Sequence, residues 1–154
     1  MTLTVDEARA KKRLYPVLLL DIELQNSGGT VYFSDKNILV GSNQYQRYIL
    51  NASNVSDAVK RSTSVGDNPA VTIKFNNKSF RTYSHLSLIE NDYPIAGAKV
   101  TIKEVYLDDD GGQSDVATLF IGIFEEIKRE TNAGFEVVAM SIKTNNSLKS
   151  IGRK

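Results

Sequence analysis

Apolar and polar residues alternate along much of this chain with the two-residue period of β-strands. The clearest case is the segment Lys99 to Leu107, KVTIKEVYL. The second half of Val17 to Leu24 and the segment Ala70 to Phe75 alternate in the same way. Because successive side chains of a strand point to opposite faces of a sheet, each segment predicts a strand with one buried and one solvated face.

Clusters of Gly, Asn, Asp and Ser separate further short apolar segments. Such residues favour turns, because glycine and asparagine tolerate positive φ and aspartate and serine bond to their own backbone. The segments between these turns predict strands at Val31 to Ser34, Ile38 to Val40, Tyr45 to Leu50, Val55 to Arg61, Ala117 to Ile127 and Gly134 to Lys143.

Two segments have features of short helices instead. Thr4 to Arg13 carries its acidic residues early and its basic residues late, an order that complements the helix dipole. In Ser84 to Asn91, Leu86 and Ile89 recur at helical spacing, and Ser84 is placed to cap the first turn.

About eight short strands joined by turns, with little helix, indicate a mainly β protein. We expect an antiparallel β-barrel or sandwich with one or two short helices. The length of 154 residues suits one domain. The sequence divides into an N-terminal charged arm or short helix at 1–13, a single β-rich domain at 14–143 and a basic C-terminal tail at 144–154.

Composition narrows the possible chemistry. The chain has no cysteine and one histidine, which excludes disulfides and thiol nucleophiles and removes most transition-metal sites. Nineteen basic residues nearly balance 18 acidic ones, so no net charge favours nucleic acid or an anionic membrane as partner. The longest apolar run, Val17 to Leu20, is too short to cross a bilayer. We therefore expect no metal, no cofactor, no nucleic-acid recognition and no membrane partner.

No catalytic motif can be assembled from the remaining residues. Asp108 to Asp110 are consecutive, whereas calcium loops need oxygen ligands at alternate positions. His85 lies near Ser84 and Ser87, but no nucleophile-elbow sequence surrounds these serines. Glu104, Asp108, Glu125 and Glu126 are candidate paired carboxylates of unknown separation, and for Glu125 and Glu126 we favour surface ion pairs. We expect that the protein is not an enzyme.

The segment NQYQRYI contains the most suggestive candidates for recognition. An arginine between tyrosines, as in Tyr45, Arg47 and Tyr48, can stack on bases, bind sugars or anchor a protein interface. The alternative, which we favour for the rings, is that they cover the open end of a small barrel. The candidate interface residues are Arg9, Lys12 and Arg13 in the N-terminal segment, together with Tyr45, Arg47 and Tyr48.

Several segments in this order resemble the distal tail and baseplate-hub proteins of tailed bacteriophages and of the related gene transfer agents. They are LLLDIEL, GTVYFSD, NQYQRYI, YPIAGAKVTIKEVY, FIGIFEEI and NSLKSIGR, within residues 14 to 153. The family pattern is matched by Thr30, Phe33 and Asp35, by Tyr45 and Tyr48, by Ala96-Gly97-Ala98 and by Phe120-Ile121-Gly122.

The resemblance implies a structural virion protein assembled in the cytoplasm of a bacterial host. Identical subunits would form a ring, a hexamer or a trimer, at the distal end of the tail tube, where it connects the tube to the tip or baseplate and the fibres. A closing heterologous interface between copies would produce such a ring. From the residues alone, a carbohydrate-binding β-sandwich that uses Tyr45, Arg47 and Tyr48 as its sugar platform remains the alternative.

Overall fold

The computed structural model describes Thr4, residues 15–53, Val55, and residues 70–109, 112–130 and 134–141. Outside the described residues lie the predicted N-terminal helix and the predicted strand at Val55 to Arg61, each except its first residue, and the basic tail. Arg9, Lys12 and Arg13 lie outside them too.

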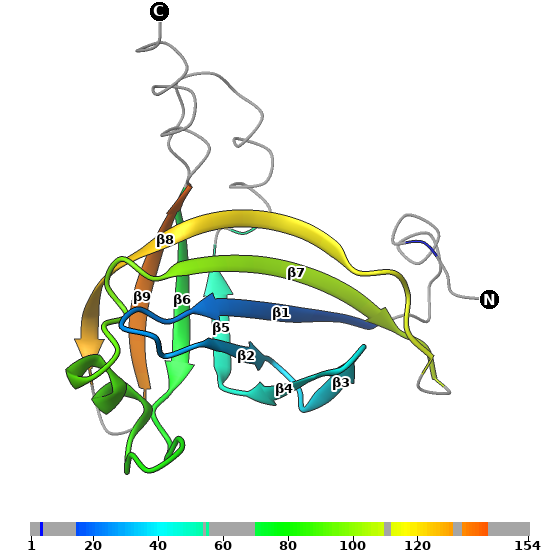
Figure 1. Ribbon diagram of the computed structural model, residues 1–154. Coiled ribbons are helices and arrows are strands. Elements are labelled where there is room, and N and C mark those ends of the chain that lie inside the picture. The colour runs from blue at the N-terminus through cyan, green and yellow to red at the C-terminus, as the bar shows by residue number, and fades with distance from the viewer. Residues whose placement is uncertain are drawn as a thin grey trace, which may run out of the picture.

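Nine strands form one mixed sheet, which confirms a mainly β fold (Figure 1). They are β1 (Tyr15–Glu23), β2 (Thr30–Ser34), β3 (Ile38–Val40), β4 (Asn43–Arg47), β5 (Ile49–Ser53), β6 (Ala70–Asn76), β7 (Lys99–Leu107), β8 (Ala117–Glu130) and β9 (Gly134–Ser141). Their order across the sheet is β3-β4-β2-β1-β7-β8-β9-β6-β5. Within the described residues, every strand pairing is antiparallel except the parallel pair of β2 and β4.

The sheet curves strongly but its strand ladder does not close into a barrel. The segment predicted as one strand, Tyr45 to Leu50, is two strands that meet at Tyr48. The Tyr48 N–H donates to the Ser34 carbonyl (3.1 Å), and its own carbonyl accepts the Asn76 N–H (2.7 Å). One residue therefore links β2 to β6 across the gap. The single-strand prediction was wrong because the two halves pair with strands at opposite ends of the sheet.

The main core lies inside the curve of the sheet. Four aromatic rings, those of Phe33, Tyr48, Phe75 and Phe80, contact one another there, with centroids 4.6–5.9 Å apart. Edge-to-face and tilted contacts of this kind add stability beyond area burial. Buried aliphatic side chains from β1, β6, β7 and β9 complete the core; they include Leu20, Ile22, Val71, Ile73, Val100, Ile102 and Val137.

A second, smaller core lies on the opposite face of β1 and β7. The hairpin of β3 and β4 packs there, and its Ile38 and Tyr45 contact a cluster that includes Val17, Leu19 and Val105. Strand β1 is therefore buried on both faces, which explains its run of four consecutive apolar residues. Strand β7 alternates in the same way, so Ile102 faces the main core and Val105, three residues later, faces the second.

A short helix, η1 (Leu86–Asn91), lies between β6 and β7 in the chain, where the pattern predicted one. It is a 3-10 helix, and its buried residues Leu86 and Ile89 pack against the main core. The predicted cap was wrong: His85 is the N-cap residue, and no side chain caps the helix. Ser84 turns instead towards the His85 ring, with its Oγ 3.3 Å from Nδ1.

Candidate interaction surfaces

Tyr45, the first predicted contact residue, lies in the second core and is 2% exposed. Its hydroxyl donates to Asp21 Oδ1 (2.6 Å), and Asp21 Oδ2 accepts from Lys103 Nζ (2.5 Å). Burial, followed by the bond to Asp21, raises the pKa of Tyr45, so the hydroxyl stays protonated and donating. Tyr45 therefore fastens the β3–β4 hairpin to β1 and β7.

Tyr48, three residues later, lies in the main core and is 5% exposed. Its hydroxyl donates to the Ser79 carbonyl (2.6 Å), and Lys78 Nζ lies 4.5 Å from its ring centroid. Burial raises the pKa of Tyr48. The ring holds the loop after β6 against the core, and its polar tip already has a partner.

The rings of Tyr45 and Tyr48, both candidate interface residues, are therefore buried in the described chain. The turn at Tyr48 sends the two rings into different cores. Arg47 alone of the three is exposed; its backbone N–H donates to Asn37 Oδ1 (2.9 Å). An interface role for Arg47, and for Arg9, Lys12 and Arg13, stays a prediction.

Two of the remaining polar candidates, Ser87 and Asp108, make structural hydrogen bonds. Ser87 is buried and its N–H donates to Asn77 Oδ1 (2.8 Å). Asp108 closes a tight turn, since its N–H donates to the Gly112 carbonyl (3.0 Å) and its Oδ1 accepts the Gly112 N–H (2.6 Å). Within the described residues no group of three or more His, Asp or Glu side chains could hold a metal ion.

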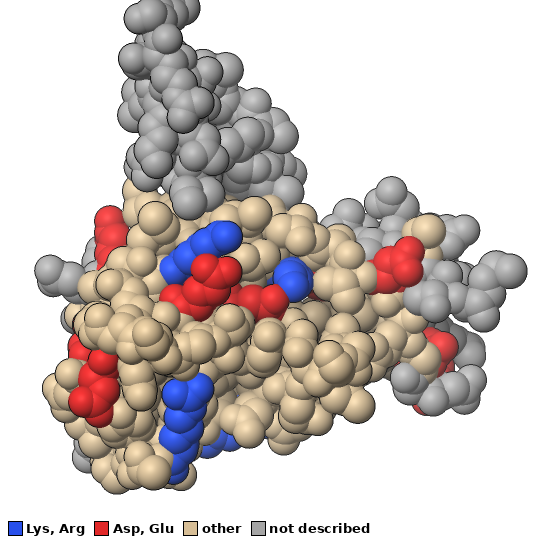
Figure 2. Space-filling model, viewed as in Figure 1, with Lys and Arg blue, Asp and Glu red and all other residues tan. Residues whose placement is uncertain are grey.

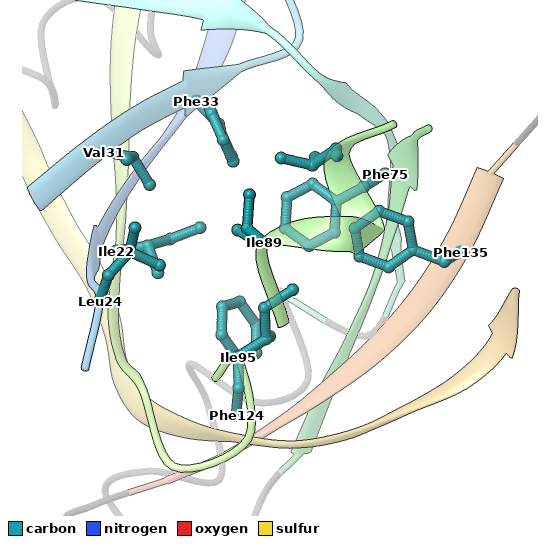
Figure 3. Close-up of a pocket in the computed structure, with 10 residues that line it drawn as sticks. Ile22, Leu24, Val31, Phe33, Phe75, Ile89, Ile95, Phe124 and Phe135 are labelled. Carbon is teal, nitrogen blue, oxygen red and sulfur yellow. The ribbon is translucent and has the colours of Figure 1, made fainter. Parts of the chain in front are cut away.

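The enclosed cavity is small and apolar (Figure 3). Its volume is about 10 Å³, and its lining side chains, which include Leu24, Phe75, Ile89 and Phe124, are all hydrocarbon. A buried water needs about 10–15 Å³ and two or more polar partners. The cavity is therefore dry, and it offers no binding site.

Charged side chains form one strip across the outer face of β1 and β7 (Figure 2). Lys99 pairs with Glu23 (3.8 Å) and Lys103 with Asp21 (2.5 Å). Because each cation has an anion beside it, the strip has no net field to attract a charged ligand.

Apolar side chains are exposed at the end of the molecule where β7 passes into β8. Leu39 is 55% exposed, Tyr15 53% and Val116 42%. Gln113 Nε2 donates to the Leu39 carbonyl (2.8 Å), which ties β3 to the β7–β8 connection. Tyr15 pairs with Leu107, beside the same connection. We call Tyr15, Leu39 and Val116 the apolar end patch; exposed apolar side chains that gather at one place are candidates for a contact surface.

Within the described residues, no helix is long and apolar enough to cross a membrane.

Comparisons with known proteins find a shared fold at low sequence identity. No family model matches the chain, and no curated protein matches its sequence. A solved structure described as the virion of a native gene transfer agent (GTA) particle contains a similar chain, with a TM-score of 0.52 and 13% identity. The match covers 84% of this chain and 41% of that chain, so this chain spans less than half the length of its neighbour. At this identity the likeness establishes a common fold.

Proposed function

We propose that this protein is a structural, non-enzymatic component of a phage tail or phage-like tail. Copies of it form a ring at the distal end of the tail tube and connect the tube to the tip or baseplate and the fibres. The observation that carries the proposal is the fold shared with a chain of a gene transfer agent virion. It agrees with the family that the segments from LLLDIEL to FIGIFEEI resemble.

The described surface supports assembly between subunits. Strands β3 and β5 end the sheet, and each has one edge with no strand partner in the described part of the chain. Free edges of this kind pair readily with another chain. The apolar end patch supplies exposed side chains at one end of the molecule, and two packed cores keep its shape fixed. A rigid subunit with different surfaces at its two ends suits a heterologous ring.

The burial of the tyrosine rings argues against the carbohydrate-binding alternative. That alternative required the rings of Tyr45 and Tyr48 to face solvent beside Arg47, and both rings are buried. A sugar platform needs an exposed aromatic face, so no observation favours this second function.

The experiment is to locate the protein in purified particles. Particles from a producing strain, carrying an epitope-tagged copy of the gene, are purified on a density gradient and labelled with antibody-coated gold for electron microscopy. We expect gold at the end of the tail remote from the head, and the protein in the particle fraction by mass spectrometry. Its absence from intact particles, or label on the head, would contradict the proposal.

A further inference from the structure

An open groove of about 330 Å³ lies beside the first half of β2. Gln44 and Gln46 of β4 form one wall, and Phe80 and Arg81 close one end. The groove exists because β4 separates from β2. Strand β2 pairs with β1 along its whole length, but with β4 only at Phe33 and Ser34. Towards its N-terminal end β4 diverges from β2, since Tyr45 is held in the second core.

The backbone of β2 presents hydrogen-bonding groups to this groove. In an antiparallel pair, alternate residues direct their N–H and C=O groups to the partner and the others direct them away. The Leu24 N–H donates to the Gly29 carbonyl (2.9 Å). The odd-numbered residues of β2 therefore direct their backbone N–H and C=O groups towards β1. The Ser34 carbonyl accepts the Tyr48 N–H on the other side. Thr30 and Tyr32 therefore direct their backbone groups towards β4. The parallel pair of Phe33 with Gln46 engages the Tyr32 carbonyl, so the groups left to the groove are the Thr30 N–H and carbonyl and the Tyr32 N–H.

Arg81 holds a cation at the end of the groove in a strained backbone. Its φ of 51° lies in the left-handed region, which a long side chain rarely adopts. Its guanidinium lies over the Phe80 ring, 5.1 Å from the centroid, and makes one long hydrogen bond, from Nη2 to the Gly28 carbonyl (3.5 Å). A guanidinium has five donors, so most remain available for a ligand. Residues held in the left-handed region occur often at ligand-binding positions, and Arg81 presents an exposed cation there.

We propose that this groove binds an extended, acidic segment of another protein. The segment adds a short strand to the part of β2 that β4 leaves unpaired, with main-chain hydrogen bonds to the Thr30 N–H and carbonyl and to the Tyr32 N–H, and its carboxylate pairs with Arg81. Strand addition of this kind obtains affinity from the backbone and specificity from side chains at alternate positions. Arg81 is the only charged residue among those that line the groove, and it selects a carboxylate through charge-assisted hydrogen bonds.

The chemistry of the described residues favours a different protein over a second copy. The two strands with free edges, ILV in β3 and ILNAS in β5, contain no acidic residue. Glu104 and Glu136 lie in β7 and β9, which have a strand partner on both edges, and Asp108 closes a hydrogen-bonded turn. If the proposed function holds, the segment belongs to a neighbouring tail protein. Only this origin of the segment rests on the proposed function, because the groove's chemistry is argued from its own residues.

The test is a titration of isotope-labelled protein with synthetic peptides, followed by amide NMR. The probe is Thr-Val-Thr-Glu-Val-Thr with blocked ends, and matched peptides carry Lys for Glu, or Pro for the second Val. We expect the Glu peptide to shift the amide signals of Thr30, Tyr32 and Arg81 progressively. The Lys peptide should bind about tenfold more weakly or worse, because it loses the ionic hydrogen bonds. The Pro peptide, which lacks a backbone donor, should bind more weakly than the Glu peptide.

Two variants separate binding from folding. Arg81→Gly removes the cation and suits the positive φ, so the protein should stay folded while the preference for Glu over Lys disappears. Lys78→Gln, which removes an exposed cation three residues away on the Tyr48 ring and outside the groove, should leave binding unchanged.

Several results would overturn the proposal. These are the absence of shifts at millimolar Glu peptide, shifts confined to other surfaces, and equal binding of the Lys peptide. Self-association that is lost in Arg81→Gly would assign the groove to a second copy and refute a different protein as its occupant. None of these results alters where gold label lies on particles, so the groove and the tail location can fail separately.

Discussion

The Tyr45 hydroxyl joins three strands at the scale of single residues. It lies in β4, its acceptor Asp21 lies in β1, and the cation that shares Asp21 lies in β7. The carboxylate thereby receives one donor on each oxygen. A polar group that is buried but fully paired fixes the position of the hairpin without leaving an unsatisfied charge.

Tyr45→Phe should lower the free energy of unfolding by about 1.5–3 kcal/mol at neutral pH, because a hydrogen bond to a charged acceptor is lost. The pKa of Tyr45 is raised above its ordinary value of 10.0. Above that pH the unfolded chain releases the proton while the folded chain keeps it, so stability falls as pH rises. Denaturant unfolding across this range should show a shallower alkaline fall in Tyr45→Phe than in the unchanged protein.

The control for this prediction is Tyr15→Phe, since Tyr15 is exposed in the apolar end patch. It should leave both the stability at neutral pH and the alkaline fall unchanged. An identical alkaline profile for Tyr45→Phe and the unchanged protein would show that the Tyr45 hydroxyl does not contribute.

Gly122 in β8 lies where two strands approach too closely for a side chain. A Cβ there would lie 2.6 Å from the Met140 carbonyl oxygen and 2.5 Å from the Phe120 ring. Since the carbonyl belongs to the sheet backbone, Gly122→Ala should destabilise the protein by about 1–3 kcal/mol. In Gly112→Ala the atom nearest to the new Cβ is a carboxylate oxygen of Asp108, which can rotate away. The loss of stability in this variant should therefore be smaller. Thermal unfolding of both variants compares them; equal losses would refute the backbone clash.

At the scale of elements, η1 closes the main core where the curved sheet leaves it open (Figure 3). Ile89→Ala should cost about 2–5 kcal/mol, because it enlarges a cavity that the neighbouring side chains already fail to fill. Leu88→Ala changes an adjacent residue that is 37% exposed and should cost far less. Urea unfolding of the two variants measures the difference, and similar midpoints would mean that η1 is not part of the core.

The β4–β5 turn shows how one segment can serve two parts of a sheet. Residues before Tyr48 pair with β2 and β3, and residues after it pair with β6. Strand β4 thus separates from β2 at its start, where Tyr45 enters the second core, and stays bonded to β2 at its end, where Tyr48 enters the main core.

At the scale of the whole molecule, the apolar end patch is where we expect copies to meet. Leu39→Asp should weaken self-association at least about tenfold, because a charge would be buried in the contact. Its thermal unfolding should be unchanged, since Leu39 is 55% exposed. Sedimentation velocity over a concentration series measures the association, and Ile121→Asp, on the outer face of β8, serves as control. Equal association of Leu39→Asp and the unchanged protein would exclude this patch from the ring contact.

Local pattern accounts for most elements of the fold but for little of the candidate surfaces. The strand predicted at Lys99 to Leu107 has the bounds of β7, and the short helix lies where Leu86 and Ile89 indicated it. The tyrosines could not be placed in this way. Tyr45 and Tyr48 have the same local setting, and only the turn between them separates their environments. The groove was missed because no residue type marks a place where two strands separate; the one local feature, an arginine at positive φ, is visible only in the backbone.

The sequence by itself determined which segments are strands, that the protein is mainly β, and that thiol chemistry is absent, because these depend on side-chain period and composition. Only the tertiary structure decided that the sheet stays open, that β1 is buried on both faces, and that β2 and β4 separate beside Arg81. The physical reason is the distance along the sequence between the residues that determine each property. A strand's period is set by neighbours two residues away, whereas pairing, burial and strain are set by residues distant in the sequence.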